Sequence, residues 1–289
     1  MRTKRFVFIG IFLVLLAGLT IALADSNIVQ ENTLGKKPRK GRTGAYSEGE
    51  LDWSTQIIKS TGFGVINPKS VNVGQARLGC LRAATVTAQR NLLEIVQGVN
   101  IDSETTVENF MTTSDVVKSQ VRGVLRGAQQ IGDPVYKADG TCEITLGMRV
   151  TGDLSDVLLP PADNFGQNAD DVPDGPQKIY TGLIIDATLM GAVPAMAPKV
   201  LDPSGEEVYG STVISREYAV EQGVVGYAKS VNQAKDNPRV APNPLVIKAL
   251  KVSGKKSADV VISDADATKL RDPNVDWQFL KECKVIIVL

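Results

Sequence analysis

The chain of 289 residues contains no histidine. Histidine is the commonest general base, the commonest protein ligand of zinc and copper, and the usual partner of a catalytic serine or cysteine. Its absence argues against an enzyme, although carboxylate, lysine or tyrosine chemistry stays open. Gly-x-Ser-x-Gly and phosphate-loop motifs are also absent from the sequence. We therefore expect a protein that is not an enzyme and that holds no cofactor.

Cysteine is scarce and odd in number, with Cys80, Cys142 and Cys283 as its three occurrences. The spacing includes no C-x-x-C or other metal-ligand pattern, so we expect no structural metal. In an oxidising compartment one disulfide can form, and Cys80 with Cys142 is the expected pair because both lie in one predicted domain. Three buried thiols that act as small apolar side chains are the alternative.

The N-terminus indicates where the protein works. A basic segment, Met1–Arg5, precedes an uncharged stretch, Phe6–Ala24, which ends in a small-x-small tripeptide. This is the anatomy of a secretory signal peptide, with cleavage expected between Ala24 and Asp25. The alternative is a retained inner-membrane anchor, because about 19 apolar residues can span a bilayer. The residue at the cleavage point is Asp25 and the first cysteine is Cys80, so we expect no lipid anchor, and we predict a protein of the periplasm or cell envelope.

Excess charge of either sign is also missing. The chain balances 32 basic against 32 acidic residues. Loss of Arg2, Lys4 and Arg5 with the signal peptide leaves 29 against 32, a net charge of −3. No global field attracts this chain to nucleic acid or to a membrane surface, so we expect no nucleic-acid partner and only indirect membrane contact after cleavage.

The length predicts two domains, because removing 24 residues from 289 leaves 265, more than one domain usually holds. We expect the α+β class: two small domains, each with helices packed on a mostly antiparallel sheet, after the N-terminal signal peptide. The predicted segments are a signal peptide (1–24), a flexible basic leader (25–48), a first domain (49–158), a linker (159–178) and a second domain (179–289). The basic run 36–42 of the leader either holds an anionic envelope polymer or is simply solvated.

Periodicity predicts the elements of the first domain. We expect a strand over 51–66 with a bend or bulge at Gly62-Phe63-Gly64, and an extended piece over 103–109. A helix over 73–97 carries small residues that allow close packing on a sheet, and a second helix over 114–126 has a capping box of Thr112 and Asp115. The Asp139-Gly140 pair predicts a hairpin of 128–136 with 142–150.

The second domain is predicted in the same way. A strand over 180–187, a hairpin of 198–201 with 207–209 and a helix over 216–235 follow the linker. The segments 245–252, 259–262 and 284–289 are rich in β-formers, and a short helix begins at Ser263.

Three groups of polar residues are candidates for a site. Asp264 and Asp266 suggest a cation site, but Ser263 with Asp266 is better explained as a helix cap. The acidic group Asp102, Glu104 and Glu108 is either a carboxylate pair or a solvated face. A ligand pocket at the domain interface would use Tyr180, Arg216 and Glu217.

A spaced pattern in the first domain resembles the LPP-twenty lipoprotein family and the related N-terminal domain of flagellar assembly protein T. The resemblance covers about residues 76–154 and rests on the following positions: Ala76-Arg77, Ala83-Ala84, Ala88–Glu94, Gly98-Val99, Asp102–Val107, Gly123, Arg126–Ala128 and Asp139–Thr141. It implies an α+β domain in a bacterial envelope protein, association with the outer membrane, and a role in flagellar assembly. This chain departs from the pattern because it lacks the lipidation cysteine.

Together these features predict a non-catalytic periplasmic protein that acts as a binding or assembly factor through exposed sheet edges. The expected partners are envelope proteins, flagellar basal-body components among them through the resemblance, or further copies of the chain. A small-ligand receptor or an enzyme at the interface of the two domains is the alternative, as is a protein anchored in the inner membrane.

Overall fold

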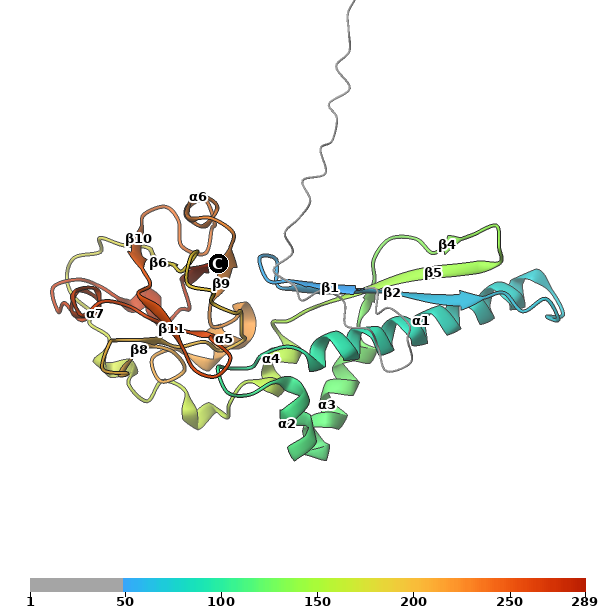
Figure 1. Cartoon of the computed structure of the whole chain (residues 1–289), viewed down its shortest axis with the longest axis horizontal. Helices are drawn as coiled ribbons and strands as arrows, with labels where there is room; N and C mark the ends of the chain where they lie inside the picture. The colour runs from blue at the N-terminus through green and yellow to red at the C-terminus, as the bar shows by residue number, and fades with distance from the viewer. Residues whose placement is uncertain (1–48) are drawn as a thin grey trace, which may run out of the picture. The chain divides into compact units, whose positions relative to one another are not determined.

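A computed structural model describes residues 49–289, so the predicted cleavage site at Ala24 and Asp25 and the basic leader lie outside the described residues. The described part of the chain is mixed α+β, as predicted, with helices and three sheets (Figure 1).

The first sheet is entirely antiparallel. Its strands run in the order β1 (Gly49–Asp52), β2 (Ile57–Val65), β5 (Thr141–Arg149) and β3 (Gln129–Gln130), and β4 (Val135–Tyr136) also pairs with β5. The predicted hairpin around Gly140 is confirmed, although its first arm is divided into β3 and β4.

Helix α1 (Val73–Gln97) lies directly on β2. Its buried stripe consists of Ala76, Cys80, Ala84, Ala88, Leu92 and Val96. A Cβ atom on Gly62 would overlap the backbone of Ala84 and Ala88, and one on Gly64 would overlap the carbonyl of Cys80. The bend expected at Gly62-Phe63-Gly64 is wrong, because these residues stay in regular register with β5. The two glycines instead make room for the helix.

Two short helices, α2 (Val107–Thr113) and α3 (Asp115–Arg126), follow α1. The extended piece predicted over 103–109 is therefore wrong. The Asp102 carboxylate accepts hydrogen bonds from the amides of Glu104 and Thr105 and turns the chain towards α2, which Thr106 caps. Ser114, and not Thr112, caps α3 by accepting a hydrogen bond from the amide of Val117.

The segment predicted as a linker is packed against the protein. Helix α4 (Asp153–Leu158) leads into the short helices η1 (Ala162–Asn164) and η2 (Ala169–Asp171). Leu159, Phe165 and Val172 are buried in the core, and an isolated bridge joins Asp174 to Asp276. Apolar residues spaced far apart anchor this segment, which gives no periodic signal in the sequence.

The remaining strands form two four-stranded sheets. One is parallel throughout, in the order β10 (Pro244–Lys248), β6 (Gly182–Asp186), β13 (Val285–Val288) and β9 (Gly226–Ala228). The other has the order β11 (Lys251–Ser253), β12 (Asp259–Val261), β7 (Val200–Leu201) and β8 (Glu207–Tyr209), with only β12 and β7 parallel. The sheet that contains β11, β12, β7 and β8 is mostly antiparallel, as predicted, and the parallel sheet beside it was not expected. Strands β6 and β13 are apolar on both faces, which is typical of parallel strands.

Short helices complete this part: α5 (Arg216–Gln222), α6 (Val231–Lys235), α7 (Asp264–Leu270) and η3 (Gln278–Leu280). The single helix predicted over 216–235 is wrong, because Gly223 with φ of +84° ends α5 and strand β9 follows. The cap at Ser263 is confirmed: its hydroxyl accepts a hydrogen bond from the amide of Asp266 at 3.1 Å.

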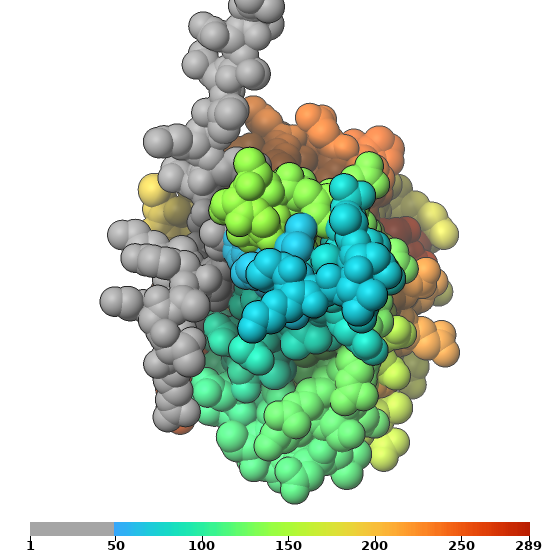
Figure 2. All heavy atoms as spheres, turned by 90° about the vertical axis from the view of Figure 1, so that its right-hand side faces the viewer, coloured from blue at the N-terminus to red at the C-terminus, as the bar shows by residue number. Residues whose placement is uncertain are grey.

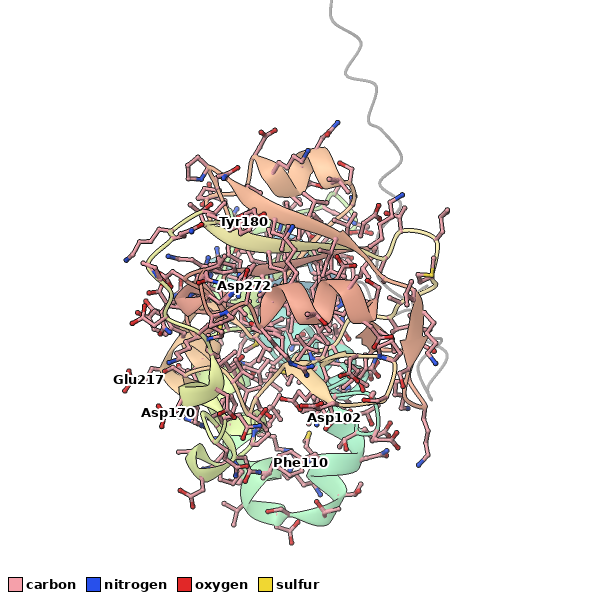
Figure 3. All side chains as sticks on the ribbon, turned by 90° about the vertical axis from the view of Figure 1, so that its left-hand side faces the viewer. Asp102, Phe110, Asp170, Tyr180, Glu217 and Asp272 are labelled. Carbon is pink, nitrogen blue, oxygen red and sulfur yellow. A yellow bond between two sulfur atoms is a disulfide. The ribbon has the colours of Figure 1, made fainter. Side chains whose placement is uncertain are left out.

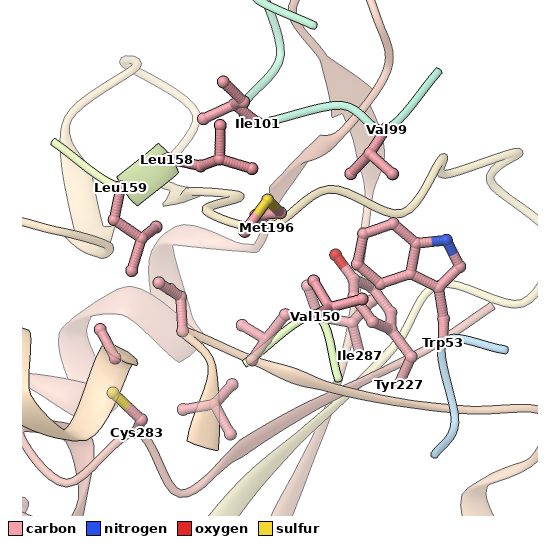
Figure 4. Close-up of a cluster of buried hydrophobic side chains, with 14 of the residues drawn as sticks. Trp53, Val99, Ile101, Val150, Leu158, Leu159, Met196, Tyr227, Cys283 and Ile287 are labelled. Atoms are coloured by element: carbon pink, nitrogen blue, oxygen red, sulfur yellow. The ribbon is translucent and has the colours of Figure 1, made fainter. Parts of the chain in front are cut away.

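One cluster of buried apolar residues contains members of both predicted domains (Figure 4). The rings of Trp53 and Tyr227 meet edge to face, with centroids 5.4 Å apart. The amide of Met196 donates to the carbonyl of Asn100 at 3.0 Å. Residues on both sides of the predicted boundary therefore share a core, and the boundary itself stays a prediction.

Candidate functional site

A hollow of about 620 Å³ lies beside α5 and has both Arg216 and Glu217 in its wall. Phe165, Ile214 and Val220 contribute apolar atoms to it. The Arg216 guanidinium donates to the Asp156 carboxylate at 2.7 Å and to the Asp156 carbonyl at 2.8 Å. A third hydrogen bond, to the carbonyl of Pro160, occupies the Nε atom. These contacts tie α5 to α4 and leave the guanidinium few donors for a ligand.

Tyr180 does not join Arg216 and Glu217 in this hollow. Its ring stacks on Trp277 with a centroid separation of 5.6 Å, and the ammonium of Lys269 lies 5.3 Å from its centre. Figure 3 shows Tyr180 and Glu217 apart, on different segments of the chain. The predicted triad is therefore not assembled.

The acidic candidates serve local structure. Asp102 caps the turn before α2, and Glu104 pairs with Lys255 at 2.9 Å. The Asp266 carboxylate accepts a hydrogen bond from the hydroxyl of Ser263 at 2.6 Å within the helix cap. Within residues 49–289, no group of three or more Cys, Asp or Glu side chains has the arrangement of a metal site.

A polar group is buried next to the free thiol of Cys283. The guanidinium of Arg239 donates to the carbonyls of Cys283 at 2.7 Å, of Gln222 at 2.9 Å and of Gly223. Burial raises the pKa of the Cys283 thiol to about 12, so the thiol stays protonated and unreactive at neutral pH. This arrangement ties three loops together, and the sequence offered no signal for it.

Cys80 and Cys142 form a disulfide that joins α1 to β5, with their Cα atoms 6.1 Å apart. Both residues are fully buried. The bond fixes the helix on the sheet close to the point where Gly64 of β2 meets the helix backbone.

A group of strongly exposed apolar residues lies at the end of the first sheet where β2 leads into α1. Val65, Val71 and Val73 are 71%, 89% and 69% exposed, and Leu78 is 70% exposed. On the adjoining hairpin, Ile131, Val135 and Tyr136 are exposed as well. Seven of the fourteen large apolar side chains that are exposed in the described part of the chain thus lie in two short segments. Figure 2 views this end, with the β2–α1 connection beside the β4–β5 hairpin.

Basic residues accompany these apolar side chains. Between Ile66 and Leu93 the sequence has four basic residues and no acidic one. Lys69, Arg77 and Arg82 are all exposed. We call residues 65–82 the β2–α1 surface. This surface was not predicted from the sequence. Two signals could have indicated it: Val73 and Leu78 fall outside the buried stripe of α1, and no acidic residue lies between positions 66 and 93.

No helix of the described chain, Gly49–Leu289, is both long and apolar enough to cross a membrane. Residues 182–289 match a family model described as Treponema pallidum Tp0624, second domain. The match begins at β6 and includes the whole parallel sheet. No curated protein matches the chain.

The family match corrects the predicted resemblance to the LPP-twenty family and flagellar assembly protein T. The family found is that of the Tp0624 second domain, and it lies outside residues 76–154. The pattern on which the resemblance rested has a physical cause. Ala84 and Ala88 are small because α1 lies against the glycines of β2, and close packing of this kind requires small residues in any family.

Proposed function

We propose that this protein is an exported, non-catalytic binding or assembly factor of the cell envelope, and that the β2–α1 surface is its contact surface. The observation that carries the proposal is the concentration of exposed apolar side chains there, led by Val71 at 89% exposure. Contiguous exposed apolar surface on a folded protein marks sites of interaction.

The support for export comes from two independent parts of the chain. The disulfide between Cys80 and Cys142 is a feature of oxidising compartments and is rare in the cytosol. The segment Met1–Ala24 has the anatomy of a signal peptide. Both features agree on the periplasm or cell envelope.

Two polar residues that were candidates for a site, and the buried Arg239, have structural partners that account for them. Arg216 holds α4 and α5 together, Asp266 belongs to a helix cap, and Arg239 binds three carbonyls. Side chains that are committed in this way favour a binding role over a catalytic one.

A small-ligand receptor is the second candidate, and the hollow of about 620 Å³ beside α5 favours it. Its volume lies in the range of ligand pockets, roughly 300–1,000 Å³. Glu217 and Glu221 give its wall negative charge, so a cationic ligand would suit it. If it is a receptor site, Glu217→Gln should abolish a ligand-induced rise in melting temperature.

The contact role is tested by site-specific photocrosslinking in cells. A photoreactive residue at Val71 is compared with one at Leu189, which is 90% exposed but far from the β2–α1 segment in sequence. The proposal predicts crosslinks from position 71, either to a discrete protein or to lipid, and none from position 189. Equal, diffuse crosslinking from both positions would remove the β2–α1 surface as a contact site.

A further inference from the structure

We propose that the β2–α1 surface docks on the surface of an anionic lipid bilayer. The inference rests on the proposed contact role of this surface and names its partner.

The apolar side chains of this surface are held outwards on a rigid base. The amide of Ile66 donates to the carbonyl of Gly140 at 2.8 Å, which ties the end of β2 to the hairpin turn. The side chain of Asn72 accepts a hydrogen bond from the amide of Gln75 at 2.8 Å and fixes the start of α1. The Cys80–Cys142 disulfide lies about two turns further along the helix. Val71 and Val73 are therefore presented by a braced connection between two elements.

The charge of the surface is complementary to lipid phosphate. Lys69, Arg77 and Arg82 are exposed, and no acidic residue lies between positions 66 and 93. The first turn of α1 also contains no acid, so the positive end of the helix dipole is not neutralised there. The guanidinium of Arg77 lies 5.3 Å from the ring centre of Tyr136. This contact places the Arg77 cation beside the hairpin.

The neighbouring hairpin supplies the opposite charge and so sets an orientation. Asp133 and Asp139 are exposed, and Glu143 pairs with Lys137. Repulsion between the carboxylates of Asp133 and Asp139 and lipid phosphate turns the hairpin away, so the side of this end that carries Lys69 faces the bilayer.

The combination of apolar side chains with cations alone favours lipid over other anionic partners. A soluble polyanion would use Lys69 and Arg82 but would leave Val71 and Val73 in water. Protein interfaces commonly surround an apolar centre with polar groups of both kinds, whereas this segment has only basic charges. Interfacial membrane binding uses both features, because apolar side chains enter the boundary of headgroups and acyl chains while cations meet the phosphates.

A local fluorescent probe tests the proposal in the chain that begins at Asp25. The label is attached at Val71→Cys or, in a separate protein, at Leu189→Cys. Labelling is selective because Cys80 and Cys142 are paired and Cys283, the remaining cysteine of the chain, is buried. Vesicles of phosphatidylethanolamine with phosphatidylglycerol should shift the emission of an environment-sensitive dye at position 71 to the blue. Vesicles of phosphatidylcholine alone should produce a much smaller shift.

Charge variants then distinguish vesicle binding by the β2–α1 surface from vesicle binding by the basic leader. At about 1 kcal/mol for each cation near an anionic surface, Lys69→Gln with Arg82→Gln should weaken binding about 30-fold. The matched control, Lys229→Gln with Lys235→Gln, removes two exposed cations from elsewhere in the chain and should leave binding unchanged.

Three results would overturn the membrane proposal. They are no blue shift of the dye emission at position 71, an equal blue shift at position 189, or an equal change of vesicle binding in both pairs of charge variants. If position 71 also crosslinks to a discrete protein in cells, the contact role survives and the lipid partner is wrong. If position 71 neither shifts with vesicles nor crosslinks in cells, both proposals fail.

Discussion

The substitution of Gly62 by alanine is the sharpest test of how α1 sits on β2. A methyl group at this position would overlap the carbonyl of Ala84 and the amide of Ala88, and would lie 2.8 Å from the Ala88 methyl carbon. Ordinary contact begins at 3.4 Å, so the helix must move by at least 0.6 Å, and by more to clear the backbone atoms.

Movement of the helix also strains the polar contacts that bind it to the strand. The hydroxyl of Ser60 donates to the carbonyl of Ala88 at 2.7 Å, and the Asn91 amide donates to the carbonyl of Thr61 at 2.8 Å. Overpacking costs about 1–3 kcal/mol, and each buried hydrogen bond adds about 1 kcal/mol. We therefore expect Gly62→Ala to lower the free energy of unfolding by about 3–5 kcal/mol.

Gly79→Ala is the matched control, because Gly79 lies within α1 and a Cβ there meets nothing within 4 Å. Helix propensity predicts a gain of up to about 1 kcal/mol from this change. In thermal unfolding followed by circular dichroism, Gly62→Ala should lower the melting temperature by about 10 °C and Gly79→Ala should raise it by about 2–4 °C. Equal stability of the Gly62 variant and the wild type would refute the packing argument.

Two further predictions concern the disulfide and the pH dependence of stability. Replacing both Cys80 and Cys142 by serine releases a loop with a sequence separation of 62 residues. Chain entropy predicts a loss of about 4 kcal/mol, visible as a lower urea midpoint that reductant also produces in the wild type; unchanged midpoints would show that the bond does not stabilise the fold. Burial alone would raise the pKa of Glu207, but hydrogen bonds from Thr212 and Lys199 outweigh it and hold the pKa below its ordinary value of 4.5. The carboxylate therefore stabilises the fold above about pH 4.5 and loses this effect as the pH falls through its lowered pKa. Glu207→Gln should cost about 1–2 kcal/mol at pH 7 and progressively less as the pH falls from 4.5 through the lowered pKa of Glu207, and a difference that does not depend on pH would contradict this linkage.

The α+β class and most elements were predictable because they depend on local patterns. The helix over 73–97, the Asp139-Gly140 turn and the Ser263 cap each result from residues close in sequence, and the structure confirms them. The helix predicted over 216–235 failed because Gly223 and the pairing of β9 with β13 overrode a weak helical pattern. Pairing between distant strands decides such cases, and periodicity within one segment does not report it.

The direction of the strands and the candidate site were harder to predict. The apolar runs of β6 and β13 indicated burial on both faces, but their parallel pairing depends on crossovers elsewhere in the chain. Tyr180 and Arg216 were grouped by residue type, and the fold places them on different elements. The β2–α1 surface could not be predicted because the exposure of a side chain depends on the tertiary fold. The local sequence around Val71 and Val73 does not show whether these side chains are buried.

The accessibility of position 71 in the intact envelope tests the central claim most directly. A Val71→Cys thiol should react with a polar maleimide rapidly in the purified chain, because Val71 is 89% exposed. In the envelope of intact cells the account predicts strong protection at this position and full reactivity of Leu189→Cys, whichever partner covers the surface. Equal reactivity of the two positions in both settings would contradict the claim that the β2–α1 surface is a contact surface.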